Sequence, residues 1–230
     1  ANEHVFTQEG APLKLRINQF KALTALKEFL RNRGIDDKLL GYFRQPTGAG
    51  KTVLFGVMAR LMDVETLILV PRTTLLDQTK KELIDMVGFS ESDIGIVGGS
   101  SNELGRKITI ATYQSHMNKM NSRNDASYKS QMRDCPLVVC DEAHRSLGSR
   151  TKESIDALDE EDFSAPETEE EEQVENEVLA DLVGFTSQKS LKLGFTATPK
   201  LAEKKVEDHF KTLIAEERYK DLIDAGVLVG

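Results

Sequence analysis

One eight-residue segment combines the residue types that bind a triphosphate. Residues 45–52 read QPTGAGKT, and Gly48 and Gly50 allow the backbone to curl so that consecutive N–H groups face one point. Lys51 would reach the β and γ phosphates, and the Thr52 hydroxyl would bind Mg²⁺. Gln45 stands where the P-loop pattern has its first Gly. The segment therefore predicts a phosphate-binding loop whose remaining contacts come from Thr47, Gly48, Ala49 and Gly50.

The residues after this loop distinguish a phosphate site from a glycine-rich turn that binds nothing. Apolar residues recur there at helical spacing, at Val53, Leu54, Val57, Met58 and Leu61. A helix that begins near Lys51 would point its N-terminus, and the partial positive charge there, at the phosphates. The helical pattern favours the phosphate site.

A nucleotide hydrolase also needs carboxylates, because Mg²⁺ prefers oxygen ligands and the attacking water needs a base. Residues 137–142 read LVVCDE, an apolar run followed by two acidic residues. We expect Asp141 to bind Mg²⁺ and Glu142 to accept a proton from water. Taken alone, the pattern fits a turn at the end of a strand equally well. Together with the phosphate-binding loop, it predicts a hydrolytic site.

Short apolar runs alternate with helical segments and predict the elements that position these residues. A first helix is indicated by Phe20, Leu23, Leu26, Phe29 and Leu30, and it ends before Gly34. The apolar runs occupy residues 40–44, 66–70, 94–97, 108–111, 137–140 and 191–195. Strands alternating with helices predict an α/β fold, with a mostly parallel sheet and helices on both faces. Ligands bind at the carboxyl ends of the strands in such sheets, where the polar residues named above lie.

Composition excludes several classes of protein. Of the 230 residues, 39% are hydrophobic and 30% are charged, which is typical of a globular protein and not of a fibrous or membrane-embedded one. The longest apolar run is far shorter than the roughly 20 residues that span a bilayer, and the first ten residues lack a signal-peptide pattern. We therefore expect no membrane partner and a cytoplasmic location. Cys135 and Cys140 fit no zinc spacing and are expected to be reduced core residues.

The net charge of −8 is unevenly distributed. Between Glu153 and Glu177 there are 13 acidic residues and no Lys or Arg, so the remainder of the chain is net basic. We expect a solvated acidic insertion at about residues 153–181, within a single domain that spans residues 1–230. Two roles stay open for this insertion: a solubilising loop, or a DNA-mimicking or autoinhibitory flap that competes for a basic groove.

Taken in order, the motifs resemble those of superfamily 2 helicases and translocases. Two of them are the segments described above: QPTGAGKT resembles the P-loop, and residues 141–144, DEAH, resemble the DEAH-type box. The other similarities are residues 15–19 to the short motif whose Gln reads adenine, 70–78 to motif Ia, 98–99 to the glycine pair, 110–114 to motif Ib and 195–199 to motif III. Within the superfamily, DEAHRS and TYQ are more similar to restriction-enzyme subunits and DNA-repair enzymes than to spliceosomal RNA helicases.

The resemblance implies a RecA-like domain and gives roles to further residues. Gln19 carries an amide donor and an acceptor, so it would pair with N6 and N7 of adenine and select ATP over GTP; the alternative is an exposed helix glutamine. His144, Thr196 and Thr198 would couple hydrolysis to nucleic-acid binding and to domain closure, although the threonines also fit strand-end caps. Contacts to a nucleic-acid backbone are implied for Pro71, Arg72, Gly98, Gly99 and Thr112.

Motors of this superfamily hold ATP between two RecA-like domains, and the second domain donates an arginine finger. Motifs IV to VI, which belong to that second domain, are not found in the sequence. Because an arginine finger contributes about 10³ to 10⁵ in rate, we expect this chain to bind ATP with Mg²⁺ but to hydrolyse it slowly alone. Nucleic acid is the expected partner, with double-stranded DNA favoured over RNA. The alternatives are an RNA helicase, or an ATP-dependent nucleic-acid-binding switch that does not translocate.

Overall fold

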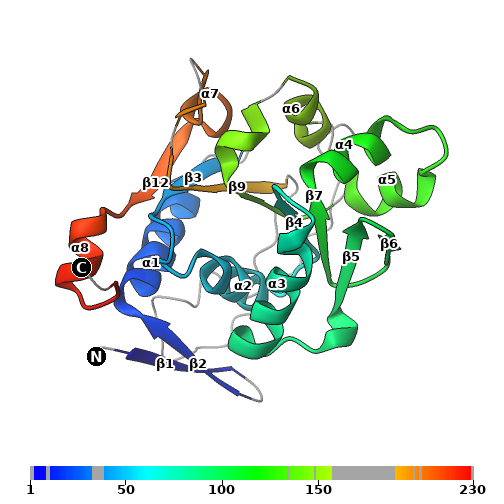
Figure 1. Ribbon diagram of the computed structural model, residues 1–230. Helices are drawn as coiled ribbons and strands as arrows, with labels where there is room; N and C mark the ends of the chain where they lie inside the picture. The colour runs from blue at the N-terminus through cyan, green and yellow to red at the C-terminus, as the bar shows by residue number, and fades with distance from the viewer. Residues whose placement is uncertain are drawn as a thin grey trace.

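Eight of the described strands form one sheet in the computed structural model, in the order β12-β3-β9-β8-β4-β7-β5-β6 (Figure 1). The structure describes residues 3–8, 11–32, 39–133, 135–147, 149–156, 190–198, 200–201 and 204–228. Short β6 (Ser101–Asn102) is antiparallel to β5, and the other pairs are parallel. The parallel strands are β3 (Leu40–Arg44), β4 (Thr66–Val70), β5 (Ile94–Gly98), β7 (Ile108–Thr112), β8 (Leu137–Asp141), β9 (Leu191–Thr196) and β12 (Thr212–Glu216). The predicted α/β fold with a mostly parallel sheet is confirmed.

Helices cover both faces of this sheet, as predicted (Figure 1). One face is covered by α1 (Ile17–Arg31), α2 (Lys51–Met62) and α3 (Thr74–Glu82), which continues into a π-helical turn, η1 (Leu83–Val87). The other face is covered by α4 (Tyr113–Asn121), α5 (Ala126–Arg133), α6 (Ser149–Asp156) and α7 (Glu207–Phe210). The other helical elements of the described residues are two 3-10 turns, η2 (Glu91–Asp93) and η3 (Ala143–Leu147), and helix α8 (Tyr219–Asp224). Two hairpins lie outside the main sheet: β1 (Glu3–Gln8) with β2 (Ala11–Arg16), and β10 (Lys200–Leu201) with β11 (Lys204–Lys205).

Alternate residues of the central strands explain why both faces need helices. In β4, Ile68 and Val70 belong to the core under α1, α2 and α3, whereas Leu67 and Leu69 belong to the core on the opposite face. Successive side chains of a strand point to opposite faces, so the run of four apolar residues from Leu67 to Val70 is stable only when water is excluded from both faces. Cys135 and Cys140 are buried in the second core as expected, and burial raises the pKa of each thiol to about 12.

All six predicted strands are confirmed, and each ends within one residue of its predicted end. The helix predicted from Phe20 to Leu30 is α1, which ends at Arg31. Strand β12 was not predicted, because it is an edge strand with exposed and half-buried side chains and therefore lacks an apolar run. It pairs with β3, the strand that leads into the phosphate-binding loop.

The acidic insertion predicted at about residues 153–181 lies mostly outside the described residues, since α6 ends at Asp156 and the description resumes at Ser190. Its role, and the assignment of residues 1–230 to a single domain, stay predictions. In the described ranges, no helix combines the length and the apolar character that crossing a membrane requires.

Candidate active site

The predicted phosphate-binding loop connects β3 to α2, so that its backbone leads directly into a helix N-terminus. Gly48 and Gly50 have positive φ values of 84° and 81°, a conformation that other residues adopt only with strain. A side chain at Gly50 would also approach Gln19 Nε2 to 2.8 Å. The two glycines are therefore required by the backbone of the turn and, at Gly50, by close packing.

Asp141 ends β8 and carries an unusual carboxylate. Burial raises its pKa to about 6, while nearby Lys51 opposes that shift and Glu142 adds to it. Its Oδ1 is buried and has no hydrogen-bond partner in the described part of the chain, although Tyr113 donates a hydrogen bond to the Asp141 main-chain oxygen at 2.9 Å. A buried oxygen acceptor without a donor fits a divalent cation.

The available ligands suit Mg²⁺ better than a metal that is held by protein side chains alone. Among the described residues, no group of three His, Cys, Asp or Glu side chains is close enough to hold a metal ion. Mg²⁺ typically takes one or two protein oxygens together with substrate phosphates and water. Asp141 and the Thr52 hydroxyl, at the first turn of α2, are residues of that type.

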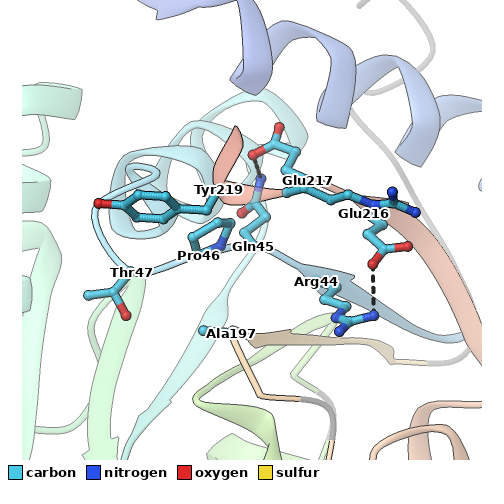
Figure 2. Close-up of a pocket in the computed structure, with 9 residues that line it drawn as sticks. Arg44, Gln45, Pro46, Thr47, Ala197, Glu216, Glu217 and Tyr219 are labelled. Carbon is cyan, nitrogen blue, oxygen red and sulfur yellow. Dashed lines mark hydrogen bonds and ion pairs between the residues drawn. The ribbon is translucent and has the colours of Figure 1, made fainter. Parts of the chain in front are cut away.

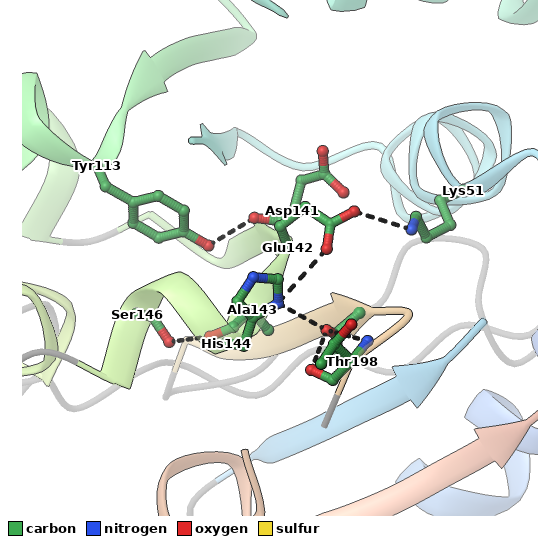
Figure 3. A network of polar contacts seen from close by, with 9 residues as sticks. Lys51, Tyr113, Asp141, Glu142, Ala143, His144, Ser146 and Thr198 are labelled. Carbon is green, nitrogen blue, oxygen red and sulfur yellow. Dashed lines mark hydrogen bonds and ion pairs between the residues drawn. The ribbon is translucent and has the colours of Figure 1, made fainter. Parts of the chain in front are cut away.

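Glu142 lies between Lys51, at the end of the phosphate-binding loop, and His144 (Figure 3). Its Oε1 accepts a hydrogen bond from Lys51 Nζ at 3.2 Å, and its Oε2 lies 3.5 Å from His144 Nδ1. The φ of Glu142 is +50°, in the left-handed region that costs a residue with a side chain about 1–3 kcal/mol. The strained backbone aims this carboxylate away from the strand direction and toward Lys51.

The three residues expected to couple the two ends of the site are joined by hydrogen bonds. Thr196 Oγ1 donates to the Thr198 main-chain oxygen at 2.7 Å and accepts from the Thr198 N–H at 3.0 Å. His144 Nδ1 lies 3.0 Å from the same Thr196 oxygen. Since the one proton of the Thr196 hydroxyl is already used, His144 Nδ1 must be the protonated nitrogen and the donor. Thr198 takes part through its backbone, and its side chain is exposed.

Gln19 is buried, with 3% of its surface exposed, so the alternative of an exposed helix glutamine is wrong. Its Oε1 accepts from Arg16 N at 2.9 Å in the N-terminal cap of α1, and its Nε2 donates to the Gly50 main-chain oxygen at 3.2 Å. The side chain thus ties α1 to the phosphate-binding loop. Its contact with adenine stays a prediction.

The residues expected to touch nucleic acid end or follow the neighbouring strands β4, β5 and β7, whose carboxyl ends meet at one edge of the sheet. Arg72 is exposed just beyond β4, and Pro71 is half-buried. Gly99 faces open space, since no atom of the described residues lies within 4 Å of the point where a Cβ would stand, whereas a Cβ at Gly98 would approach Leu76 and Ser115 to 3.1 Å. The Thr112 hydroxyl is buried and caps α4, accepting from Ser115 N at 3.0 Å.

Sequence reasoning missed Glu217, which lies directly after β12. Its Oε2 accepts a hydrogen bond from Gln45 Nε2 at 3.2 Å (Figure 2). The same oxygen accepts a second one from Asn18 Nδ2 at 3.4 Å. Burial raises the pKa of Glu217, and the two amide donors oppose that shift. No motif marks this residue, because its two partners are 172 and 199 residues away along the chain.

Comparisons with known proteins identify the family of the chain. The chain matches the family described as "Type III restriction enzyme, res subunit" over residues 12–201. It is 30% identical to the DNA 3'-5' translocase XPB2 of Sulfurisphaera tokodaii over 131 residues, which are 57% of this chain and 26% of that protein. It is 33% identical to the DNA 3'-5' helicase XPB of Mycobacterium tuberculosis over 103 residues, 43% of this chain and 18% of that protein. The chain thus spans about a quarter or less of the length of these two relatives.

Solved structures support the fold independently. The helicase domain of Hef from Pyrococcus furiosus superposes with a TM-score of 0.60 at 18% identity, covering 91% of this chain and 40% of that one. At this identity the likeness concerns the fold alone. The family match covers both the phosphate-binding loop and the DEAH sequence, and the chain belongs to the family of type III restriction enzyme res subunits.

Proposed function

We propose that this chain is the ATP-binding and ATP-hydrolysing motor domain of a DEAH-type superfamily 2 helicase or translocase that acts on DNA. The observation that carries the proposal is the chain of contacts from Lys51 through Glu142 and His144 to Thr196. It links the phosphate-binding loop to the ends of β8 and β9. Few uses other than phosphate chemistry need a lysine, a strained carboxylate and an unpartnered aspartate oxygen at the same edge of a sheet.

The contact between Lys51 and Glu142 suggests how the site is activated. The Lys51 ammonium is paired with Glu142 in the structure, with Nζ 3.2 Å from Oε1. The phosphates of bound ATP carry more negative charge than one carboxylate, so Lys51 turns to them and frees Glu142 Oε1. Glu142 then accepts a proton from the attacking water, while His144, whose Nδ1 proton is donated to Thr196, lies 3.5 Å from the other carboxylate oxygen. Mg²⁺ held by Asp141 and Thr52 would neutralise charge that develops on the phosphates.

DNA is the proposed partner because the two curated relatives named above act on DNA by name. The proposed contacts are Arg72, Gly99 and the main chain around Thr112, beside the carboxyl ends of β4, β5 and β7. A second RecA-like domain is the proposed source of the arginine finger. RNA remodelling and an ATP-dependent binding switch without translocation are the two competing functions.

The test is Mg²⁺-dependent ATP turnover by the 230-residue chain and by its full-length parent, each with double-stranded DNA, single-stranded DNA or RNA. We expect duplex DNA to stimulate the parent strongly and the isolated chain weakly. Lys51→Ala should abolish ATP binding in calorimetry, and undiminished affinity in that variant would refute the assignment of the site. Stimulation by RNA alone would favour the RNA helicase, and turnover without displacement of a triplex-forming strand would favour the switch.

A further inference from the structure

The side chain of Tyr113 connects the start of α4 to the end of β8 (Figure 3). Its hydroxyl donates a hydrogen bond to the Asp141 main-chain oxygen at 2.9 Å, across 28 positions of the chain. Strand β4 lies between β8 and β7, the strand that α4 follows, and the pairing of β4 with β8 ends at Leu69 and Cys140. Tyr113 therefore reaches past β4 to the residue where that pairing has stopped, which is the residue before Glu142.

Packing and capping keep this hydroxyl in place as a donor. Thr112 caps α4 by accepting a hydrogen bond from Ser115 N at 3.0 Å, which fixes the main chain from which the Tyr113 side chain starts. The side chain is 7% exposed and packs in the core that contains Cys140. Burial raises the pKa of Tyr113 well above its usual value, and the nearby Cys140 and Asp141 add to that shift. The phenol consequently keeps its proton throughout the pH range of ordinary assays.

The oxygen that accepts this hydrogen bond controls the backbone of the next residue. The Asp141 carbonyl and the Glu142 N–H belong to one planar peptide unit. Glu142 has a φ of +50°, and rotation of that peptide unit would return it to an unstrained negative φ. The same rotation would swing the Asp141 oxygen away from Tyr113 and break the hydrogen bond. Because the Glu142 oxygen accepts from Arg145 N at 2.8 Å, the strained residue has a hydrogen bond on each side.

We propose that Tyr113 is a positioning residue for ATP hydrolysis, whose hydroxyl holds the peptide unit between Asp141 and Glu142 so that the Glu142 carboxylate faces the reaction. This inference rests on the proposed function, in which Glu142 is the base. The Glu142 Oε1 lies 3.2 Å from Lys51 Nζ at the end of the phosphate-binding loop. Without the Tyr113 hydrogen bond, more molecules would have a relaxed Glu142 backbone and a carboxylate that points elsewhere. The phosphate-binding loop would keep its own backbone, so ATP affinity should not depend on the tyrosine.

The experiment compares Tyr113→Phe, which removes only the hydroxyl, with the matched variant Tyr128→Phe. Tyr128 lies in the same core, is 1% exposed, and has its hydroxyl 2.8 Å from His116 Nδ1. ATP turnover of the full-length parent is measured with Mg²⁺ and the nucleic acid that stimulates it most, and kcat is expressed per nucleotide-binding site, so that partial unfolding does not lower it. We expect Tyr113→Phe to lower kcat by about 2- to 10-fold, the equivalent of one hydrogen bond, at an unchanged KM for ATP. Tyr128→Phe should keep both constants.

A double variant tests whether the effect passes through Glu142. In Glu142→Gln the base is already lost, so adding Tyr113→Phe should not lower the single-turnover rate further. The proposal is overturned if Tyr113→Phe keeps the kcat of the unchanged protein, if Tyr128→Phe lowers kcat equally, or if Tyr113→Phe costs the same factor with and without Glu142. In those cases the proposed function stands as long as Lys51→Ala abolishes turnover. Absence of turnover in the unchanged protein, or turnover that survives in Lys51→Ala, would refute the proposed function and the role of Tyr113 with it.

Discussion

The hydroxyl group of Thr196 should contribute more to the free energy of unfolding than the rest of its side chain. Thr196 is fully buried, and its Oγ1 makes three hydrogen bonds: to His144 Nδ1 and to the N–H and the carbonyl oxygen of Thr198. Thr196→Val keeps the shape of the side chain and removes all three. His144 can turn part of the way to Glu142 Oε2, 3.5 Å from its Nδ1, and Thr198 can reach water. We therefore expect a loss of about 1–3 kcal/mol in the free energy of unfolding.

Thr109 provides a matched control in the same sheet. It is 1% exposed in β7, and its Oγ1 has no hydrogen-bond partner in the described part of the chain. Thr109→Val removes a buried polar group that is unsatisfied, so it should be neutral or should stabilise the fold by about 1 kcal/mol. Both variants change the same atom, in the same type of strand, at nearly the same burial.

The assay is urea unfolding of the two variants and of the unchanged chain, followed by circular dichroism and analysed with a shared denaturant dependence. The reasoning is refuted if Thr196→Val and Thr109→Val lower the free energy of unfolding by the same amount. That result would mean that the hydrogen-bonded hydroxyl of Thr196 contributes no more to stability than the unpartnered hydroxyl of Thr109.

Three further changes have expected outcomes. Glu142→Gln should keep ATP affinity and reduce turnover by about 10²–10⁴, because the amide cannot accept the proton; single-turnover kinetics with unchanged rates would exclude Glu142 as the base. His116 is buried between Tyr128 and the Ser154 oxygen, and burial lowers its pKa to about 4. As the pH falls below about 6.5, the histidine of the unfolded chain therefore binds a proton before that of the folded chain does. The free energy of unfolding should drop by about 2 kcal/mol between pH 7 and pH 5 for this reason. The pH profile of His116→Gln should lack this drop. Gly56→Ala should destabilise the chain by about 1–3 kcal/mol in urea unfolding although alanine favours helices, because the new methyl group would lie 2.5 Å from Leu83 Cδ2; a stabilised variant would show that α2 and η1 can separate.

The sheet could be predicted from sequence where burial alone determines the side chains. Strands such as β4 and β8 are apolar on both faces, and the runs Thr66–Val70 and Leu137–Asp141 therefore stand out from their surroundings. Strand β12 shares the same sheet but borders solvent, and Leu213 is 42% exposed. Strand β12 pairs along one edge and is partly covered on one face, so its residues mix polar and apolar types in a pattern that many loops share.

The site divides in the same way. The phosphate-binding loop and the DEAH sequence are local, so their residue types and spacing predict the turn and the strand end that the structure contains. The contact between Lys51 and Glu142 spans 91 residues, and the one between His144 and Thr196 spans 52. Those contacts follow from the order of the strands, which a local pattern does not encode. The same is true of Gln19, whose burial depends on where α1 packs against the loop.

Strand β12 has a practical consequence for anyone who truncates this protein. The family match ends at residue 201, ahead of β12, and a fragment cut at that boundary would lose the partner of β3. The unpaired N–H and C=O groups of β3 would then form a bare edge of the sheet, which invites pairing between copies and aggregation. Leu228, which lies 3.2 Å from the position of a side chain on Gly48, would be lost as well. Expression boundaries, and any limited-proteolysis map of the domain, should therefore keep the polypeptide through residue 228.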